Sequence, residues 1–257
     1  MDVLLAGFLG SLAAGLMTTV GALPVLAGRT VSPRASDGLL GFAAGVMLSA
    51  SFFSLLIPAI DRAELLYGGA TAPALIAAAG LLLGAGGVAL ANELVPHEHF
   101  TKGREGPDAA ALKGIWLFVI AITIHNLPEG LAVGVGFAGG DFTNGTSLAV
   151  GIGLQNAPEG LAVAVALLRQ GYGRFHAFGV ASLTGMVEPV GGLIGVAAAS
   201  ISTPILPWAL AFSAGAMIYV ISHEIIPETH RRGGQHVATA GLVLGLTAMM
   251  ILEVVLG

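Results

Sequence analysis

Two short segments of this 257-residue chain repeat one combination of polar residues within apolar surroundings. Residues 125–133 read His-Asn-Leu-Pro-Glu-Gly-Leu-Ala-Val, and residues 155–163 read Gln-Asn-Ala-Pro-Glu-Gly-Leu-Ala-Val, so seven of nine positions are identical. Imidazole nitrogens and the oxygens of amides and carboxylates are ligands that divalent transition metals accept. The repeated pattern therefore indicates a metal site that is built from two copies of one segment.

The spacing within each copy puts the candidate ligands on one side of a helix. His125 and Glu129 are four residues apart, as are Gln155 and Glu159, and such pairs share a helical face. A carboxylate inside a membrane costs about 3 kcal/mol or more, and two that lie together also repel each other. A divalent cation offsets both costs. The alternative is a helix-packing network with protonated carboxyls, which the second copy of the motif disfavours.

Two further residues are expected at the same depth, counted at about 1.5 Å per helical residue. They are Met47 and Glu188, the latter within Gly-Met-Val-Glu-Pro at positions 185–189. A thioether favours zinc or cadmium over calcium or magnesium. Taken alone, a methionine in a membrane helix is more often a packing residue.

Two other groups of polar residues lie outside the central motifs, one near the end of the predicted span 204–226 and one in the connection 96–113. His223 and Glu224 are adjacent and could form a relay between the centre and the cytoplasm, or could be interfacial residues. His97 and His99 flank a glutamate within the longest polar connection, residues 96–113. Histidine-rich tracts bind metals loosely, and the alternative is an ordinary solvated loop.

The composition identifies the surroundings of these groups. Hydrophobic residues make up 55% of the chain and charged residues only 10%, against about 25% charged residues in soluble domains. We therefore expect a membrane protein. A net charge of −5 without a basic patch excludes a nucleic-acid partner. The absence of cysteine excludes disulfides, thiolate metal sites and cysteine nucleophiles.

Apolar runs of about 20 residues predict an all-α polytopic protein with eight transmembrane helices in one domain over residues 1–257. The predicted spans are residues 3–27, 38–60, 72–95, 114–138, 146–169, 175–199, 204–226 and 237–256. The two motifs then lie on consecutive antiparallel spans, which makes them an inverted repeat. Transporters place their binding sites at such repeat interfaces, near the middle of the membrane.

The distribution of charge predicts the orientation. Nine of the ten Lys and Arg residues fall in the first, third, fifth and seventh connections. By the positive-inside rule these connections are cytoplasmic, so both termini lie outside the cell membrane. The outer side then carries acidic residues that could concentrate cations or could be ordinary interface charges. These acidic residues are Asp2, Asp61, Glu64, Asp141 and Glu253.

The motifs resemble those of the ZIP (Zrt/Irt-like protein) family of divalent metal transporters, specifically its GufA-like branch. The resemblance rests on the two Asn-x-Pro-Glu-Gly segments, on Met-Val-Glu-Pro at 186–189 and on the His-Glu pair at 223–224. It implies a 3+2+3 arrangement of spans with inverted repeats. It also implies a first metal site with the ligands Met47, His125, Glu129, Gln155 and Glu159. A second site would use Asn126, Glu129, Asn156, Glu159 and Glu188, with the two glutamates as bridges.

The resemblance also implies further roles. His223 and Glu224 would be cytoplasmic exit ligands, and His97 and His99 would be loop ligands. Some members have Asp where this chain has Asn156, and the neutral amide would weaken the second metal site. Family members look like elevator-type carriers that are often homodimers.

The expected function is transport of Zn²⁺, and also of Cd²⁺, Fe²⁺ or Mn²⁺, into the cytoplasm, with metal ions and lipid as partners and no organic cofactor. No phosphate-binding Gly-x-x-x-x-Gly-Lys-[Ser/Thr] motif occurs, so the energy must come from a gradient or the membrane potential. An intramembrane metal hydrolase is the alternative from another class. It is disfavoured because the His-Glu pair lacks the second histidine of His-Glu-x-x-His. A passive metal channel on the same ligands stays open.

Overall fold

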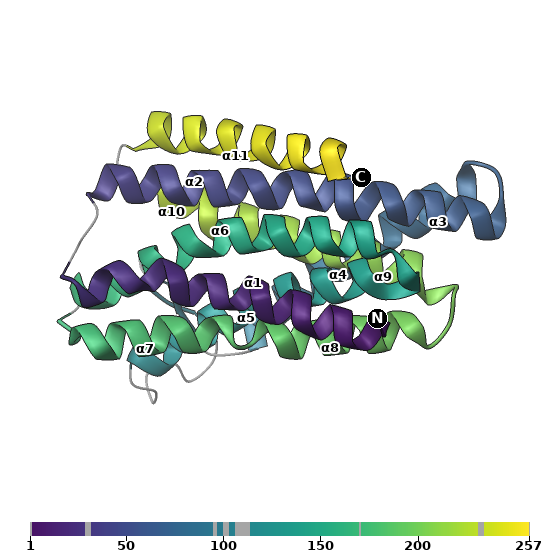
Figure 1. The fold of residues 1–257 in the computed structure, drawn as a ribbon. Helices are drawn as coiled ribbons and strands as arrows, with labels where there is room; N and C mark the ends of the chain where they lie inside the picture. The colour runs from purple at the N-terminus through teal and green to yellow at the C-terminus, as the bar shows by residue number, and fades with distance from the viewer. Residues whose placement is uncertain are drawn as a thin grey trace.

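The computed structural model describes residues 2–28, 32–94, 97–99, 103–105, 114–169, 171–230 and 234–256. Nearly all of them are helical, and the long helices lie side by side in one elongated bundle (Figure 1). Both termini lie at the same end of this bundle. The described part of the chain therefore has the architecture of an all-α polytopic membrane protein, as the sequence predicts.

The long helices along the bundle are α1 (Val3–Leu26), α2 (Pro33–Ala50), α4 (Thr71–Leu94), α5 (Gly114–Phe137), α6 (Phe142–Arg169), α9 (Ile205–Val220) and α11 (Gln235–Leu256). Shorter helical elements extend or join them: α3 (Ile57–Tyr67), α7 (Arg174–Gly185), α8 (Glu188–Ser200), α10 (Ile226–His230), the π-helices η1 (Ser51–Leu56) and η4 (Ile221–Ile225), and the 3₁₀-helix η3 (Ala138–Gly140). The most extensive helix pairs are α2 with α11, α1 with α6, α4 with α9, and α5 with α8.

Short polar residues cap the first turns of two helices, α1 and α2. Asp2 accepts a hydrogen bond from the Leu4 backbone N–H at the start of α1. Ser32 does the same for the Ala35 N–H, directly before Pro33 in the first turn of α2. Side-chain oxygens at such positions satisfy backbone donors that have no partner within the helix. The apolar segments between these polar residues can then run unbroken across the bundle.

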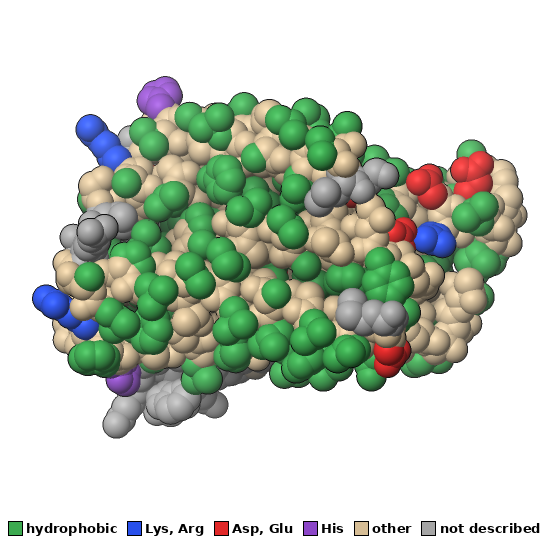
Figure 2. Space-filling model, in the orientation of Figure 1, with side chains coloured by type: hydrophobic (Ala, Val, Ile, Leu, Met, Phe, Trp, Pro, Cys, Tyr) green, Lys and Arg blue, Asp and Glu red, His purple; other side chains and the backbone are tan. Residues whose placement is uncertain are grey.

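Seven helices or helix series in the described part of the chain are long and apolar enough to cross a membrane. They include 33–67, which joins α2, η1 and α3, and 174–200, which joins α7 and α8. The surface agrees with this assignment. On the face shown in Figure 2, hydrophobic side chains are spread over the middle, and the described charged side chains lie toward the two ends.

One predicted span is interrupted. The sequence predicts a continuous helix over 175–199, but α7 ends at Gly185 and α8 begins at Glu188. Pro189 explains the break, because its ring has no N–H to donate and clashes with the carbonyl four residues earlier. The break makes Glu188 the first residue of a new helix.

Two other predicted spans contain a π-helix. The segment η1 follows α2 and precedes Pro58, and η4 follows α9 and precedes Pro227. In each, the residue before the proline bonds to the carbonyl five residues earlier, from Ile57 to Phe52 and from Ile226 to Ile221. Each proline removes one ordinary helical bond, and π-helical turns are often found at functional sites.

The connection predicted as a loop over 96–113 contains a short antiparallel ribbon. Strand β1 (His97–His99) pairs with β2 (Gly103–Glu105), and residue 97 lies opposite residue 105. The side chains of His97 and His99 lie outside the described part of the structure.

Candidate metal centre

Each copy of the repeated motif lies inside a long helix, the first in α5 and the second in α6. Pro128 and Pro158 are both interior residues of continuous helices. The two helices pack against each other, so the motifs belong to one central region.

The predicted ligands in this region are buried. Glu129, Gln155 and Glu188 are fully buried, and Glu159 is only 8% exposed. A buried carboxylate is unfavourable unless hydrogen bonds, a counter-charge or a metal compensates it. The other buried predicted ligands whose side chains are described are Met47, Asn126 and Asn156. The side chain of His125 lies outside the described part.

Three of these side chains are joined by hydrogen bonds. Asn156 donates from Nδ2 to Oε1 of Glu188 over 2.7 Å and to the backbone carbonyl of Ala14 over 2.9 Å. Gln155 donates from Nε2 to Oδ1 of Asn156 over 2.6 Å. Helices α1, α6 and α8 therefore meet at Asn156.

The motif glycines bring the helices into backbone contact. A Cβ added to Gly130 would come within 2.1 Å of the Glu188 carbonyl oxygen, and one added to Gly160 within 2.0 Å of the Thr18 carbonyl oxygen. Small residues allow membrane helices to approach in this way. The contact at Gly130 sets the motif of α5 directly against the first residue of α8.

The described side chains alone do not form a cluster of three or more His, Asp or Glu around a common point. The predicted set draws on Met47, Gln155 and Asn126 as well, and on His125. The Oε1 oxygen of Gln155 is buried and has no hydrogen-bond partner among the described residues. Such an oxygen can coordinate a divalent cation.

The predicted exit residues lie in η4, at the end of α9. His223 is half-buried, and its ring stacks on that of Tyr219 with 4.9 Å between the ring centroids. The side chain of Glu224 lies outside the described part of the structure.

A polar cluster that the sequence did not reveal lies where η1, α6 and α11 meet. Glu253 accepts hydrogen bonds from Ser54 over 2.8 Å and from Ser147 over 2.5 Å. Glu253 is in the predicted acidic set, but nothing in the sequence pairs it with serines 106 and 199 residues away.

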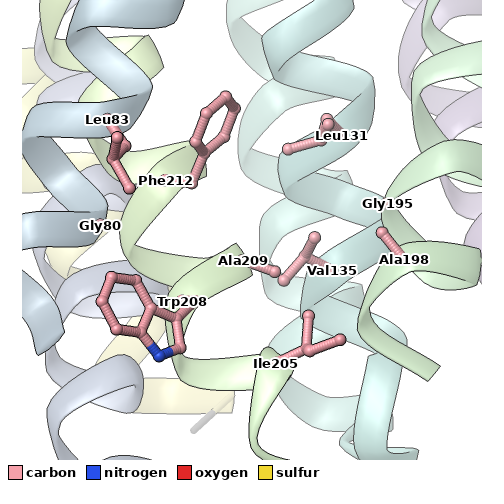
Figure 3. Close-up of a pocket in the computed structure, with 10 residues that line it drawn as sticks. All are labelled: Gly80, Leu83, Leu131, Val135, Gly195, Ala198, Ile205, Trp208, Ala209 and Phe212. Atoms are coloured by element: carbon pink, nitrogen blue, oxygen red, sulfur yellow. The ribbon is translucent and has the colours of Figure 1, made fainter. Parts of the chain in front are cut away.

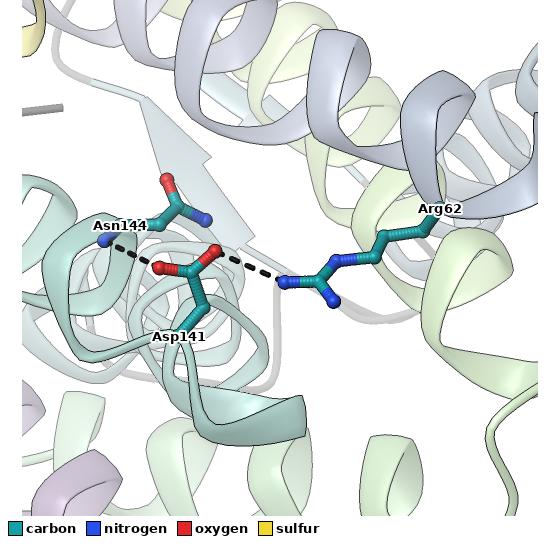
Figure 4. A network of polar contacts seen from close by, with 3 residues as sticks. All are labelled: Arg62, Asp141 and Asn144. Atoms are coloured by element: carbon teal, nitrogen blue, oxygen red, sulfur yellow. Dashed lines mark hydrogen bonds and ion pairs between the residues drawn. The ribbon is translucent and has the colours of Figure 1, made fainter. Parts of the chain in front are cut away.

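Another acidic residue of the predicted set is neutralised by an ion pair. Arg62 of α3 donates to Asp141 over 3.1 Å, and Asp141 also accepts from the Asn144 backbone N–H at the start of α6 (Figure 4). Both charged side chains are more than one third exposed. Such pairs contribute about 1 kcal/mol or less, so this contact mainly reduces the negative charge at that end.

An apolar pocket of about 290 Å³ lies between α4, α5, α8 and α9 (Figure 3). Its walls include Leu83, Leu131, Trp208 and Phe212. It presents no carboxylate, amide or imidazole group, so it is not the metal centre.

Comparison with known proteins gives consistent matches. Residues 91–253 match the family model described as ZIP Zinc transporter. The chain is 48% identical over 252 residues to the zinc transporter GufA of Myxococcus xanthus, with 98% of this chain and 99% of that protein covered. It is 46% identical over 255 residues to the zinc transporter ZIPB of Bordetella bronchiseptica, covering 97% and 81% of the two chains. It is 36% identical over 322 residues to human zinc transporter ZIP11, covering 94% of each.

Proposed function

This chain belongs to the ZIP zinc transporter family, and from that premise we propose that it carries Zn²⁺ through the membrane into the cytoplasm. The proposal rests above all on the buried, doubled Asn-x-Pro-Glu-Gly motif of α5 and α6. The glutamates of the two motifs, Glu129 and Glu159, are both buried, and a divalent cation that binds between them offsets the cost of burying two carboxylates together. The protein is a transporter and not an enzyme.

The proposed zinc site uses Met47, His125, Glu129, Gln155 and Glu159. Sulfur, nitrogen and oxygen ligands together favour zinc and its neighbours over magnesium or calcium. We therefore expect Cd²⁺, Fe²⁺ and Mn²⁺ as competing substrates. His223 and Glu224 are the proposed ligands on the way out, with His97 and His99 beyond them. Metal binding displaces protons from such ligands, so uptake should weaken in acid.

We also propose that the chain has eight spans in a 3+2+3 arrangement. The eighth span is α5, which adds to the seven candidate membrane-spanning segments. The support for this arrangement is the pattern of helix pairs. In this arrangement the first three spans correspond to the last three, and α5 corresponds to α6. The α1–α6 pair is then equivalent to the α5–α8 pair, and the α2–α11 pair is equivalent to the α4–α9 pair. These are the four most extensive pairs. The π-helices η1 and η4 correspond under the same exchange.

We propose that both termini are extracytoplasmic and that the membrane is the cell membrane. On the face shown in Figure 2, described basic side chains and histidines gather at one end of the bundle. Acidic side chains, with one basic side chain among them, gather at the other end, where both termini lie. Positive charge marks the cytoplasmic side. A homodimer in the bilayer is proposed on the family resemblance alone.

The test is zinc uptake by purified protein in proteoliposomes, with Glu129→Ala beside the wild type. We expect saturable uptake in the wild type and background uptake in the variant, with retained folding checked by gel filtration. Saturation well below the rate of diffusive conduction would identify a carrier and not a channel. Zinc binding by correctly inserted wild type without uptake, under a pH gradient and a membrane potential, would overturn transport.

A further inference from the structure

The hydrogen bonds of Gln155, Asn156 and Glu188 all run in one direction. Gln155 donates to Asn156, and Asn156 donates to Glu188, over 2.6 and 2.7 Å. All three side chains are at least 99% buried. Water therefore cannot replace any of these three side chains as a hydrogen-bond partner, and each amide is held in the orientation that its neighbours require.

The backbone of α1 fixes the orientation of Asn156. The carbonyl of Ala14 can only accept a hydrogen bond, so the atom of Asn156 at 2.9 Å must be Nδ2. The same nitrogen uses its other hydrogen for Glu188. The oxygen of Asn156, its one atom suited to a metal, is thereby turned toward Gln155 and accepts a hydrogen bond from it.

The orientation of Gln155 follows from that of Asn156. Its Nε2 is directed at Asn156, so its Oε1 occupies the other branch of the amide. This oxygen is buried and lacks a hydrogen-bond partner among the described residues. A buried acceptor without a partner is unfavourable, and a divalent cation in the proposed zinc site would satisfy it.

We propose that Asn156 and Glu188 are positioning residues, which turn the Gln155 amide so that its oxygen faces the transported zinc ion. This inference rests on the proposed function. It also assigns one zinc ion, and not two, to each central site. The family resemblance implies a second ion beside Glu188, but there Asn156 presents N–H groups, which repel a cation. Groups that orient a metal ligand in this way commonly change metal affinity by about 10- to 100-fold.

Zinc stoichiometry and affinity of the purified protein in detergent test the assignment. We expect one tightly bound zinc ion per chain, measured by equilibrium dialysis with metal analysis. Glu188→Gln keeps an acceptor oxygen for Asn156, so affinity should stay within about threefold of wild type. Glu188→Ala removes the acceptor and should lower affinity by about tenfold. Stoichiometry should stay at one in both variants. Two ions in wild type, falling to one in Glu188→Gln, would overturn the proposal.

A double-mutant cycle separates positioning from a general loss of structure. Gln155→Ala removes the ligand through which Glu188 acts, so adding Glu188→Ala should cause little further loss. Additive losses would show that Glu188 does not work through Gln155 and would overturn the inference. Failure of the proposed function would give a different result. The wild type would then bind one zinc ion and the variants would change its affinity as described, but no zinc would enter the proteoliposomes.

Discussion

Gly160 of α6 lies so close to Thr18 of α1 that no side chain fits between them. An added Cβ would come within 2.0 Å of the Thr18 carbonyl oxygen. In the other copy of the motif, Gly130 meets the carbonyl of Glu188 in the same way. The glycine of each motif therefore sets the packing of its helix, and the glutamate before it is the proposed metal ligand.

Gly160→Val should destabilise the protein because backbone atoms of α1 and α6 would have to separate. Overpacking of this kind costs about 1–3 kcal/mol or more. The measurement is the thermal unfolding midpoint in detergent, with Gly86→Ala of α4 as the control. Nothing lies within 4 Å of a Cβ at position 86, so the control should be neutral or stabilised by up to about 1 kcal/mol. Equal unfolding midpoints for Gly160→Val and wild type would contradict the packing role.

Glu159→Gln should reduce zinc uptake to near background while the helix packing stays intact. The amide matches the carboxylate in size but lacks its charge, and it binds a hard or borderline cation far more weakly. Proteoliposome uptake measures the loss, which we expect to be about 100-fold, or about 2.7 kcal/mol. Glu64→Gln is the matched control, because Glu64 is exposed near the end of α3. Near-normal uptake by folded Glu159→Gln would remove Glu159 from the metal path.

The sequence predicts most of the helices because each apolar run matches one crossing of the bundle. It does not predict what each proline does. Pro128 and Pro158 lie inside continuous helices, Pro189 follows a break, and Pro58 follows a π-helix. The outcome depends on whether neighbouring helices satisfy the carbonyl that each proline leaves unpaired. That information lies in tertiary contacts, which a single segment does not contain.

The same limit applies to the central site. The repeated motif names its candidate ligands directly, and the structure buries those whose side chains are described. The orientation of Asn156 could not be predicted, since it depends on the carbonyl of Ala14, 142 residues earlier. The bonds from Ser54 and Ser147 to Glu253 likewise join distant segments.

Met47→Leu should change the choice of metal more than the stability of the fold. Leucine has nearly the volume of methionine, so the buried position can be refilled at a cost below about 1.5 kcal/mol. Loss of the thioether removes the softest ligand, so the binding of cadmium should weaken more than that of the other metals. We expect cadmium to compete with zinc uptake about tenfold less well, with little change for manganese. An unchanged cadmium-to-manganese ranking would make Met47 a packing residue only.

His223→Ala should slow zinc release more than zinc binding. His223 lies in η4, which contains neither copy of the motif, and its ring stacks on that of Tyr219. If it receives the ion after the central site, its loss should lower the maximal uptake rate on the order of tenfold, about 1.4 kcal/mol in the barrier. The equilibrium affinity for zinc should stay nearly constant, because the central ligands are unchanged.

Tyr219→Phe is the control for His223→Ala, since it keeps the stacked ring and should leave both quantities close to wild type. Uptake rates at saturating zinc, together with equilibrium binding in detergent, separate the two effects. A parallel fall in affinity would mean that His223 supports the central site and not release. An unchanged uptake rate would leave His223 as an interfacial residue, and the route from the central motif to the cytoplasm would then have to run along other helices.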